Sequence, residues 1–311
     1  MNKFICFFSV FCLFFPSCKK MEIISNQTPP LVVEADSITF AVIGDYGKEG
    51  DPLFLVSKMI DGWNPDFIIT LGDNNYPDGK LSTINKNLGQ YFCDYIYNPD
   101  APEGHVCSGR AHNDKLNRFF PSIGNHDYNS TDDIIPYLNY FSLPGVEEYY
   151  DFQWGPVHFF ALNSGRQGDS ECCTSKQSTW LKETMENSER QFKIVYFHHA
   201  PYSPSNHGNN EAMQWDFKSW GASAVMSGHD HVYSRIHTSN QQDFAYFVNG
   251  LGGSSMYNCD SNPLDEAFFD VFCYQENYGA MLVKANEDQI KFQFFQIDDE
   301  NTPVDEFILT K

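Results

Sequence analysis

Five short apolar runs in this chain each end in Asp, Asn or His, and this repetition constrains the fold more than any other feature. Short runs of β-branched and aromatic residues bounded by Gly and Asp are typical of buried strands. The five runs are followed by Gly44-Asp45, Gly72-Asp73, Gly124-Asn125, His198-His199 and Gly228-His229. Because ligands of open α/β sheets bind beyond the carboxyl ends of the strands, we expect these side chains to meet in one crevice.

Strand-like and helix-like stretches alternate along the chain, which is typical of an α/β fold. Helices are predicted over residues 175–187 and after Asp51, which we expect to cap a helix with Pro52 in its first turn. Strands are predicted at 38–43, 67–71, 119–123, 192–197, 222–226, 244–248, 280–284 and 290–296, with a hairpin over 149–163. No internal repeat or linker interrupts residues 37–311, which we interpret as one domain.

The composition is acidic, with 41 Asp and Glu against 20 Lys and Arg and a formal net charge of -21. Such a surface would repel a polyanion, so we predict no nucleic-acid partner. Small phosphorylated substrates are still possible, because bound metal ions reverse the local field.

Residues 1–18 are predicted to be a signal peptide. Lys3 precedes the apolar run 4–15, which is too short to span a bilayer. Cys18 follows Ser17 at the end of this run and resembles a bacterial lipoprotein cleavage site, so a lipid on Cys18 would attach the protein to a membrane. An ordinary cleaved signal peptide is the alternative, and both interpretations export the protein. Residues 19–36, which include Pro29 and Pro30, are predicted to be a flexible spacer.

The cysteines agree with export. Removing Cys6, Cys12 and Cys18 leaves six of the nine cysteines in the mature chain, and the sequence alone does not fix their pairing. Loop closure favours two pairs that enclose short loops. These pairs are Cys93–Cys107 and Cys259–Cys273, which leaves Cys172–Cys173 as a vicinal pair.

The side chains at the strand ends are oxygen and imidazole donors, which suit first-row transition metals. They are too many for one tetrahedral ion, and a carboxylate such as Asp73 can bridge two ions. Two bridged metals can hold phosphate oxygens, supply hydroxide and stabilise the leaving oxygen, which indicates hydrolysis of a phosphate ester. The donors are Asp45, Asp73, Asn125, His199, His229 and His231.

The same motifs resemble those of calcineurin-like metallophosphoesterases, and more narrowly those of purple acid phosphatases of the small tartrate-resistant type. The resemblance covers about residues 38 to 300. It implies a fold of two mixed β-sheets packed as a sandwich and flanked by α-helices. The motifs are Gly44-Asp45-x-Gly47, Gly72-Asp73-Asn74-x-Tyr76, Gly124-Asn125-His126-Asp127, His199-x-Pro201 and Gly228-His229-x-His231.

The resemblance implies a dinuclear centre of Fe(III) and a divalent iron, zinc or manganese ion, with Asp73 bridging. The ferric ligands would be Asp45, Tyr76 and His231, and the divalent-ion ligands would be Asn125, His199 and His229. His199 is preferred to His198 because the family pattern is His-x-Pro, and His198 is then expected to point to the opposite face of its strand. His126 and His207 match histidines that bind phosphate and assist the leaving group. Asp127 and Asp230 are interpreted as exposed turn residues, with orientation of neighbouring imidazoles as the alternative.

The residue at position 47 distinguishes purple acid phosphatases from many other metallophosphoesterases. Many metallophosphoesterases have a histidine two residues after the first aspartate, and here that residue is Gly47. The missing ligand would be Tyr76. A phenol has an ordinary pKa of about 10, so it binds as tyrosinate only beside a strongly charged ion such as Fe(III).

These observations predict an exported acid phosphatase that hydrolyses phosphate monoesters with metal-bound hydroxide and without a phosphoenzyme intermediate. Its substrate would be a phosphorylated small molecule or a phosphoprotein. A phosphodiesterase or nucleotide pyrophosphatase on the same fold is the alternative enzyme. A phosphate-binding protein without activity is a further alternative, which the intact donor set disfavours.

Overall fold

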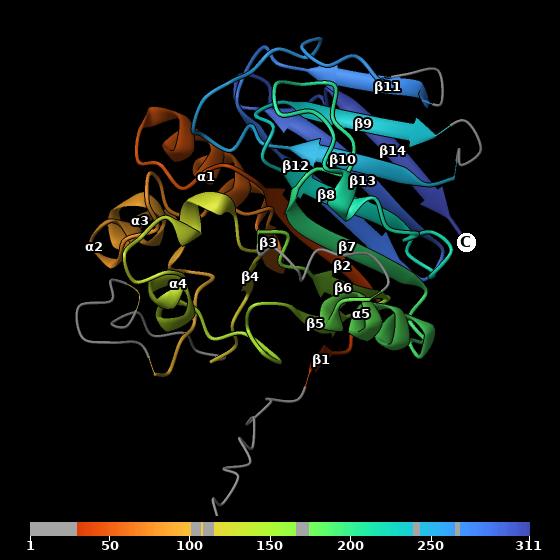
Figure 1. Cartoon of the computed structure of the whole chain (residues 1–311), viewed down its shortest axis with the longest axis horizontal. Helices are drawn as coiled ribbons and strands as arrows, with labels where there is room; N and C mark the ends of the chain where they lie inside the picture. Colours follow the sequence, from red (N-terminus) through yellow and green to blue (C-terminus); the bar gives the residue numbers. More distant parts are fainter. Residues whose placement is uncertain (1–29, 101–106, 108–114, 166–173, 239–242, 265–267) are drawn as a thin grey trace, which may run out of the picture.

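The computed structural model describes residues 30–100, 107, 115–165, 174–238, 243–264 and 268–311 (Figure 1). The predicted signal peptide, most of the predicted spacer and the predicted Cys172–Cys173 pair lie outside these residues. No helix in this described part of the chain is long and apolar enough to cross a membrane.

Two β-sheets form the centre of the fold. The larger has eight strands in the order β1-β5-β6-β7-β8-β10-β9-β11, and its β6, β7, β8 and β10 are parallel. Its strands are β1 (Leu31–Val33), β5 (Tyr150–Trp154), β6 (Val157–Ala161), β7 (Phe192–His199), β8 (Ala224–Gly228), β9 (Tyr233–Thr238), β10 (Ala245–Asn249) and β11 (Phe268–Tyr274).

The smaller sheet has six strands in the order β14-β13-β12-β2-β3-β4, with β2, β3 and β4 parallel. Its strands are β2 (Ser37–Ile43), β3 (Phe67–Thr70), β4 (Phe119–Pro121), β12 (Gly279–Asn286), β13 (Gln289–Gln296) and β14 (Asp305–Thr310). Each sheet therefore contains parallel and antiparallel pairs, which confirms the predicted mixed sheets.

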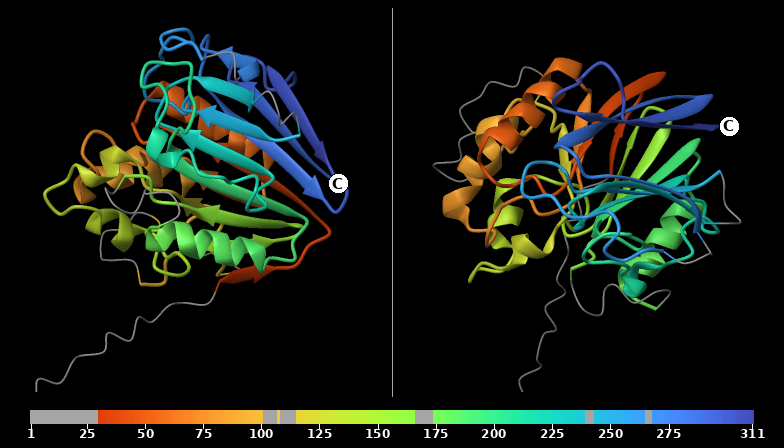
Figure 2. Two further views of the ribbon diagram at one scale, coloured as in Figure 1. Left: turned by 45° about the vertical axis from the view of Figure 1, so that its right-hand side comes forward. Right: turned by 90° about the horizontal axis from the view of Figure 1, so that it is seen from above.

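Aromatic side chains fill the space between the two sheets. Phe40 on β2 lies edge-on to Phe159 on β6, with ring centroids 5.1 Å apart, and Phe67 on β3 contacts Phe152 on β5 at 5.7 Å. These rings are fully buried. Edge-to-face packing adds to the free energy gained by removing such large apolar surfaces from water. The two sheets are thereby held face to face, as seen from above in Figure 2.

Helices cover the outer faces. Trp63 of α1 packs on Phe295 of the smaller sheet, and Leu181 of α5 joins the apolar cluster on the other side of the larger sheet. This is the predicted sandwich flanked by helices. The helices are α1 (Asp51–Trp63), α2 (Leu81–Ile84), α3 (Gln90–Phe92), α4 (Ile135–Tyr140) and α5 (Lys176–Glu186), with short turns η1 (Asn85–Gly89), η2 (Asn125–Tyr128) and η3 (Glu211–Met213).

Several local expectations need correction. Residues 31–33 of the predicted spacer form strand β1, which pairs with β5, because Leu31-Val32-Val33 is a β-forming run at an open sheet edge. Gly50 rather than Asp51 is the N-cap of α1, and it makes no side-chain cap. Strands β9, β11 and β14 and helix α4 were not predicted.

Both short-loop disulfides are present, which confirms their pairing. The S–S distances are 2.08 Å for Cys93–Cys107 and 2.09 Å for Cys259–Cys273. The second bond ties the segment after β10 to strand β11.

Candidate dinuclear metal centre

Three of the predicted donors sit in unusual backbone turns directly after their strands. Asp45, Asp73 and His229 have φ angles of 52°, 53° and 71°. The left-handed region costs a non-glycine residue on the order of 1 kcal/mol or more, and such residues gather at functional sites. The His229 amide donates to Asp45 Oδ2 at 2.8 Å, and the Asp45 amide donates to the Gly72 carbonyl at 3.2 Å. The strand ends thus meet as predicted.

Four donor atoms form a first cluster, called site 1 here. The Tyr76 hydroxyl lies 3.3 Å from Asp45 Oδ1, 2.8 Å from Asp73 Oδ2 and 3.3 Å from His231 Nε2. His231 Nε2 is also 3.3 Å from Asp45 Oδ1. Tetrahedral coordination with bonds of about 2.0–2.2 Å puts neighbouring ligand atoms about 3.3–3.6 Å apart. Site 1 has nearly this spacing and brings together the predicted ferric ligands.

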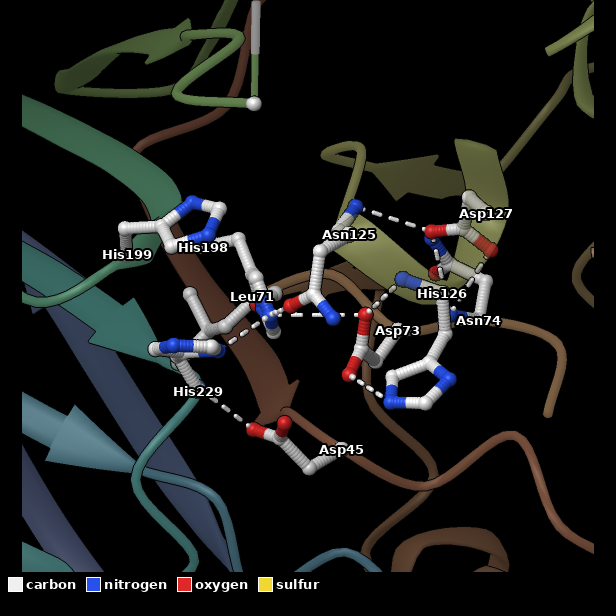
Figure 3. A network of polar contacts seen from close by, with 12 residues as sticks. Asp45, Leu71, Asp73, Asn74, Asn125, His126, Asp127, His198, His199 and His229 are labelled. Atoms are coloured by element: carbon white, nitrogen blue, oxygen red, sulfur yellow. Dashed lines mark hydrogen bonds and ion pairs between the residues drawn. The ribbon is translucent and has the colours of Figure 1, made fainter. Parts of the chain in front are cut away.

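A second cluster, site 2, involves the other carboxylate oxygen of Asp73. Figure 3 shows His198, Asn125 and His229 beside that residue. His198 Nε2 is 2.9 Å from Asn125 Oδ1, 3.3 Å from Asp73 Oδ1 and 3.1 Å from His229 Nδ1. Asp73 therefore gives one carboxylate oxygen to each site. This is the arrangement that a bridging carboxylate requires.

The prediction that His198 points away from the site is wrong. Its imidazole is fully buried, and its Nδ1 donates to the Leu71 carbonyl oxygen at 2.8 Å. The register between β7 and β8 shifts between Tyr196 and His199, so simple alternation of side chains does not hold at this strand end. His198 thereby enters site 2.

His199 also stays near the cluster. Its Nδ1 shares a hydrogen bond of 2.9 Å with the Ser164 hydroxyl, and its ring centroid is 4.4 Å from that of His229. Three ring nitrogens, one from each of His198, His199 and His229, lie within 4.8 Å of one another. Ligation by His199 stays a prediction. The contacts of His198 Nε2 with Asn125 and Asp73 favour His198 as the ligand at site 2.

The chemistry of these donors fits cations. Because His198 Nδ1 carries the proton given to Leu71, its Nε2 presents a lone pair to the oxygens of Asn125 and Asp73. Burial also lowers the pKa of His198 well below its ordinary value, which keeps the ring neutral. Lone pairs facing one another repel unless a cation lies between them. Site 2 is therefore suited to a metal ion.

Burial has the same consequence at site 1. Asp45 and Asp73 are 0% and 1% exposed, and within the described residues their ion pairs are with histidines alone. Burial raises the pKa of Asp45 to about 6, against the opposing effect of His231. Burial, with Asp45 and Asp73 nearby, raises the pKa of Tyr76 far above its ordinary value. A buried carboxylate needs a positive partner, which a metal ion would supply.

Comparison with known proteins agrees with this geometry. A family model described as Calcineurin-like phosphoesterase matches residues 38–233, which is more than half of the chain. The chain belongs to the calcineurin-like phosphoesterase family. This confirms the predicted family and makes the protein a metallophosphoesterase.

Two curated relatives narrow the resemblance to purple acid phosphatases. Purple acid phosphatase 17 of Arabidopsis thaliana is 23% identical over 298 residues, which cover 84% of this chain and 81% of that protein. Purple acid phosphatase 4 of the same plant is 23% identical over 306 residues, which cover 84% of this chain and 80% of that protein.

Solved structures share the fold. The purple acid phosphatase PPD1 from yellow lupin (Lupinus luteus) seeds has a TM-score of 0.70 and 16% identity, over 89% of this chain but 54% of the lupin chain. The chain thus spans about half the length of that protein. A structure described as GAP50, the anchor in the inner membrane complex of Plasmodium, has a TM-score of 0.63 and 17% identity, with 89% of both chains covered.

Gly47 of this phosphoesterase leaves room that site 1 needs. A Cβ atom at Gly47 would lie 2.1 Å from the carbonyl carbon and oxygen of Asn74. The Gly47 amide donates to the Asp73 carbonyl at 3.2 Å, and the Tyr76 amide donates to the Gly47 carbonyl at 2.7 Å. A histidine at position 47 would displace the loop that carries Tyr76. Glycine at position 47 is therefore needed for Tyr76 to reach site 1.

The two predicted phosphate-binding histidines flank the donors on opposite sides. The His126 amide donates to Asp73 Oδ1 at 2.9 Å, and its ring lies 4.4 Å from the Tyr76 ring. The His207 ring stacks on His229 with centroids 4.0 Å apart, and it is exposed. Each imidazole is thus near enough to contact a substrate that binds at the donors. Their catalytic roles stay predictions.

Asp127 and Asp230 are buried, so the interpretation of both as exposed turn residues is wrong. Asp127 accepts hydrogen bonds from the backbone amides of Gly124 and Asn74 at 2.8 and 3.1 Å. Asp230 accepts from the His207 amide at 2.8 Å. Tight turns direct several N–H groups inward, and a carboxylate satisfies them. Burial raises the pKa of Asp127 to about 7.

Some supporting residues escaped sequence analysis. Ser255 shares a hydrogen bond of 2.7 Å with His231 Nδ1, which directs Nε2 of that ring toward site 1. Tyr257 stacks flat on the same ring at 4.3 Å. Asn74 stands in the predicted Gly72-Asp73-Asn74-x-Tyr76 motif, but its hydrogen bond to Asp127 was not predicted. Ser164 and Ser255 carry no sequence signal, since isolated serines in loops are common.

Proposed function

We propose that this metallophosphoesterase is an exported acid phosphatase that hydrolyses phosphate monoesters at a centre of Fe(III) and a divalent ion. The observation that carries the proposal is the Tyr76 hydroxyl, which lies within 3.3 Å of Asp45, Asp73 and His231. Phenolate ligation favours a trivalent ion, and a trivalent ion acidifies water enough to work at low pH. The curated relatives named purple acid phosphatases support the same subfamily.

We assign the ligands as follows. Asp45, Tyr76 and His231 would hold Fe(III), and Asp73 would bridge. Asn125, His198 and His229 would hold the divalent iron, zinc or manganese ion, with His198 in the place first predicted for His199. When bound, such a metal pair supplies the nucleophilic hydroxide and neutralises charge on the phosphate.

The remaining side chains would act on the substrate. His126 and His207 stand on either side of the donors, where imidazole N–H groups can bind phosphate oxygens. His207 is the more exposed ring and stacks on His229. It could hand a proton to the departing alkoxide, which is the step that a general acid assists.

Export is supported by the sequence and by two disulfides. Disulfides form and persist in oxidising compartments, and Cys93–Cys107 and Cys259–Cys273 are both formed. The predicted signal peptide would direct the chain there, with a lipid on Cys18 as the membrane-attached form.

A phosphodiesterase of the same fold is the second candidate, and a protein without activity is the third. GAP50, described as an anchor, has the same fold, so the fold alone does not favour catalysis. The complete set of seven clustered donors favours catalysis, because a binding protein has no need to keep all of them.

The test is metal analysis of purified protein together with activity on phosphate monoesters and diesters across pH. We expect two metal ions per chain, one of them iron, and acid hydrolysis of monoesters that a chelator abolishes. Preference for diesters near neutral pH would favour the second candidate. Two bound metals without turnover of either class would favour the third.

A further inference from the structure

A cavity opens beside His207, whose ring stacks on the donor His229. It has a volume of about 490 Å³, within the range of about 300–1,000 Å³ typical of small-molecule sites. His207 stacks on His229 at 4.0 Å, so one side chain separates this cavity from site 2. We call it the His207 pocket; it is lined by Ser203, His207, Asn209, Asn262, Leu264 and Phe268, among others.

The walls of the His207 pocket are held in place by hydrogen bonds between two loops. Asn262 Nδ2 donates to the Ser205 carbonyl at 2.7 Å, and the Ser261 hydroxyl donates to Asn206 Oδ1 at 2.6 Å. The Cys259–Cys273 disulfide anchors one of these loops to β11. Because these loops are already held in place, they lose little conformational entropy when a ligand binds.

Two of the polar residues that line the His207 pocket, Asn209 and Asn262, each keep one side-chain group for a ligand. Asn209 Oδ1 already accepts from the Ser203 amide at 3.0 Å, and its Nδ2 has no partner within the described residues. Asn262 Nδ2 is used by Ser205, and its Oδ1 likewise has no partner in that part of the chain. Two amides can therefore offer one N–H and one carbonyl oxygen to a ligand.

Apolar side chains line one part of the pocket, beside its serine, histidine and asparagines. Leu264 and Phe268 pack partly buried against the outer apolar cluster, and Phe268 lies 4.9 Å from the ring of Tyr202. Among the described residues that line the pocket there is no Lys or Arg. A leaving group with further phosphates would find no cationic partner here.

We propose that the His207 pocket binds the nucleoside of a nucleoside monophosphate while its phosphate lies at the metal centre. An adenine edge carries an acceptor for the free amide N–H of Asn209 and a donor for the free carbonyl of Asn262. The flat, weakly polar face of the base suits Leu264 and Phe268. This inference rests on the proposed monoesterase function and adds the substrate class to it.

The test compares hydrolysis of AMP, glucose 6-phosphate, glycerol 1-phosphate and ADP by the metal-loaded protein. We expect kcat/KM for AMP to exceed that for the other three by about tenfold or more, the effect of one or two matched hydrogen bonds. Adenosine should inhibit glycerol 1-phosphate hydrolysis competitively, and glucose should not.

Asn209→Asp is the decisive variant. It keeps the oxygen that accepts from the Ser203 amide and removes the free N–H, so the loop should stay folded. Asn206→Asp is the matched control, because it adds the same charge to the same loop outside the pocket and keeps the acceptor for Ser261. Asn209→Asp should reduce the preference for AMP over glycerol 1-phosphate about tenfold and weaken adenosine inhibition. Asn206→Asp should change neither.

The outcomes separate the two proposals. If no monoester is hydrolysed, the proposed function fails. If monoesters are hydrolysed but AMP has no advantage, or if Asn209→Asp keeps the full preference, the nucleoside pocket is wrong while the phosphatase stands. A preference for glucose 6-phosphate lost in Asn209→Asp would assign the pocket to sugars and overturn the nucleoside inference.

Discussion

The Asp230 carboxylate accepts a hydrogen bond of 2.8 Å from the backbone amide of His207. A second bond of 3.2 Å comes from the Gly208 amide to the other oxygen. Asp230 lies between His229 and His231 in sequence, so the turn that carries two metal donors also fixes the loop that carries His207. The metal centre and the histidine beside it are therefore built as one unit.

His207→Ala tests whether this imidazole takes part in catalysis. The ring contacts His229 only by stacking and belongs to neither donor cluster. We expect kcat on monoesters to fall by about 10²-fold or more, the usual worth of a positioned proton donor, while both metals stay bound. Activity and metal content measured on the same preparation check this. Loss of a metal ion would instead make His207 part of the centre.

Asp230→Asn tests whether the carboxylate positions His207. The amide oxygen can still accept one of the two backbone bonds, so we expect a smaller fall in kcat, about tenfold, with KM and metal content near those of the parent. The double variant with His207→Ala should be no slower than His207→Ala alone, because Asp230 acts through that ring. Additive losses would show that Asp230 has a separate, structural effect.

The paired histidines give a prediction about metal content. His198→Ala removes the nitrogen that faces Asp73 and Asn125, and we expect the divalent ion to bind at least about tenfold more weakly, so that it is lost on dialysis. His199→Ala, its matched neighbour, should keep two ions per chain. Elemental analysis after dialysis distinguishes the two variants. The opposite result would restore His199 as the ligand, as the His-x-Pro pattern first indicated.

This pair also marks the limit of what the sequence could predict. Strand ends at Asp45, Asp73 and Asn125 were predictable, because apolar runs followed by polar turns define them locally. The choice between His198 and His199 depends on a register shift between β7 and β8, which is a relation between two strands. A motif within one strand carries no information about the register between that strand and its neighbour.

Burial was the other feature that the sequence hid. Asp127 and Asp230 stand in polar turn segments, where exposed aspartates are common. Their burial follows from backbone amides contributed by residues 53 and 23 positions away, Asn74 and His207. The disulfides were predictable for the contrary reason, since both close short loops.

Gly47 gives a prediction about stability. A methyl group there would overlap the backbone of Asn74 at 2.1 Å, and backbone cannot move aside as a side chain can. We expect Gly47→Ala to lower the free energy of unfolding by about 3 kcal/mol or more. Gly62→Ala is the control, because nothing lies within 4 Å of its added Cβ and it sits in helix α1. That change should be neutral or stabilising by up to about 1 kcal/mol. Equal melting temperatures for the two variants would contradict the close approach.

Tyr76 decides whether this phosphoesterase is one of the purple enzymes. If its oxygen binds Fe(III), charge transfer from tyrosinate to iron should colour the oxidised protein. Tyr76→Phe keeps the packing of the ring against His126 and removes only the donor oxygen. We therefore expect the variant to fold, to lose the visible absorption band, and to hold Fe(III) about tenfold or more weakly.

The spectrum of the metal-free protein supplies the control for Tyr76. Burial and the neighbouring Asp45 and Asp73 raise the pKa of the Tyr76 phenol far above its ordinary value, so without metal the group stays protonated. The band should then appear only when Fe(III) is added to the parent chain, and not when Zn(II) is added. An iron-loaded parent without colour, or colour unchanged in Tyr76→Phe, would place the protein outside the purple group. Its membership of the phosphoesterase family would be unaffected, because that rests on the match over residues 38–233.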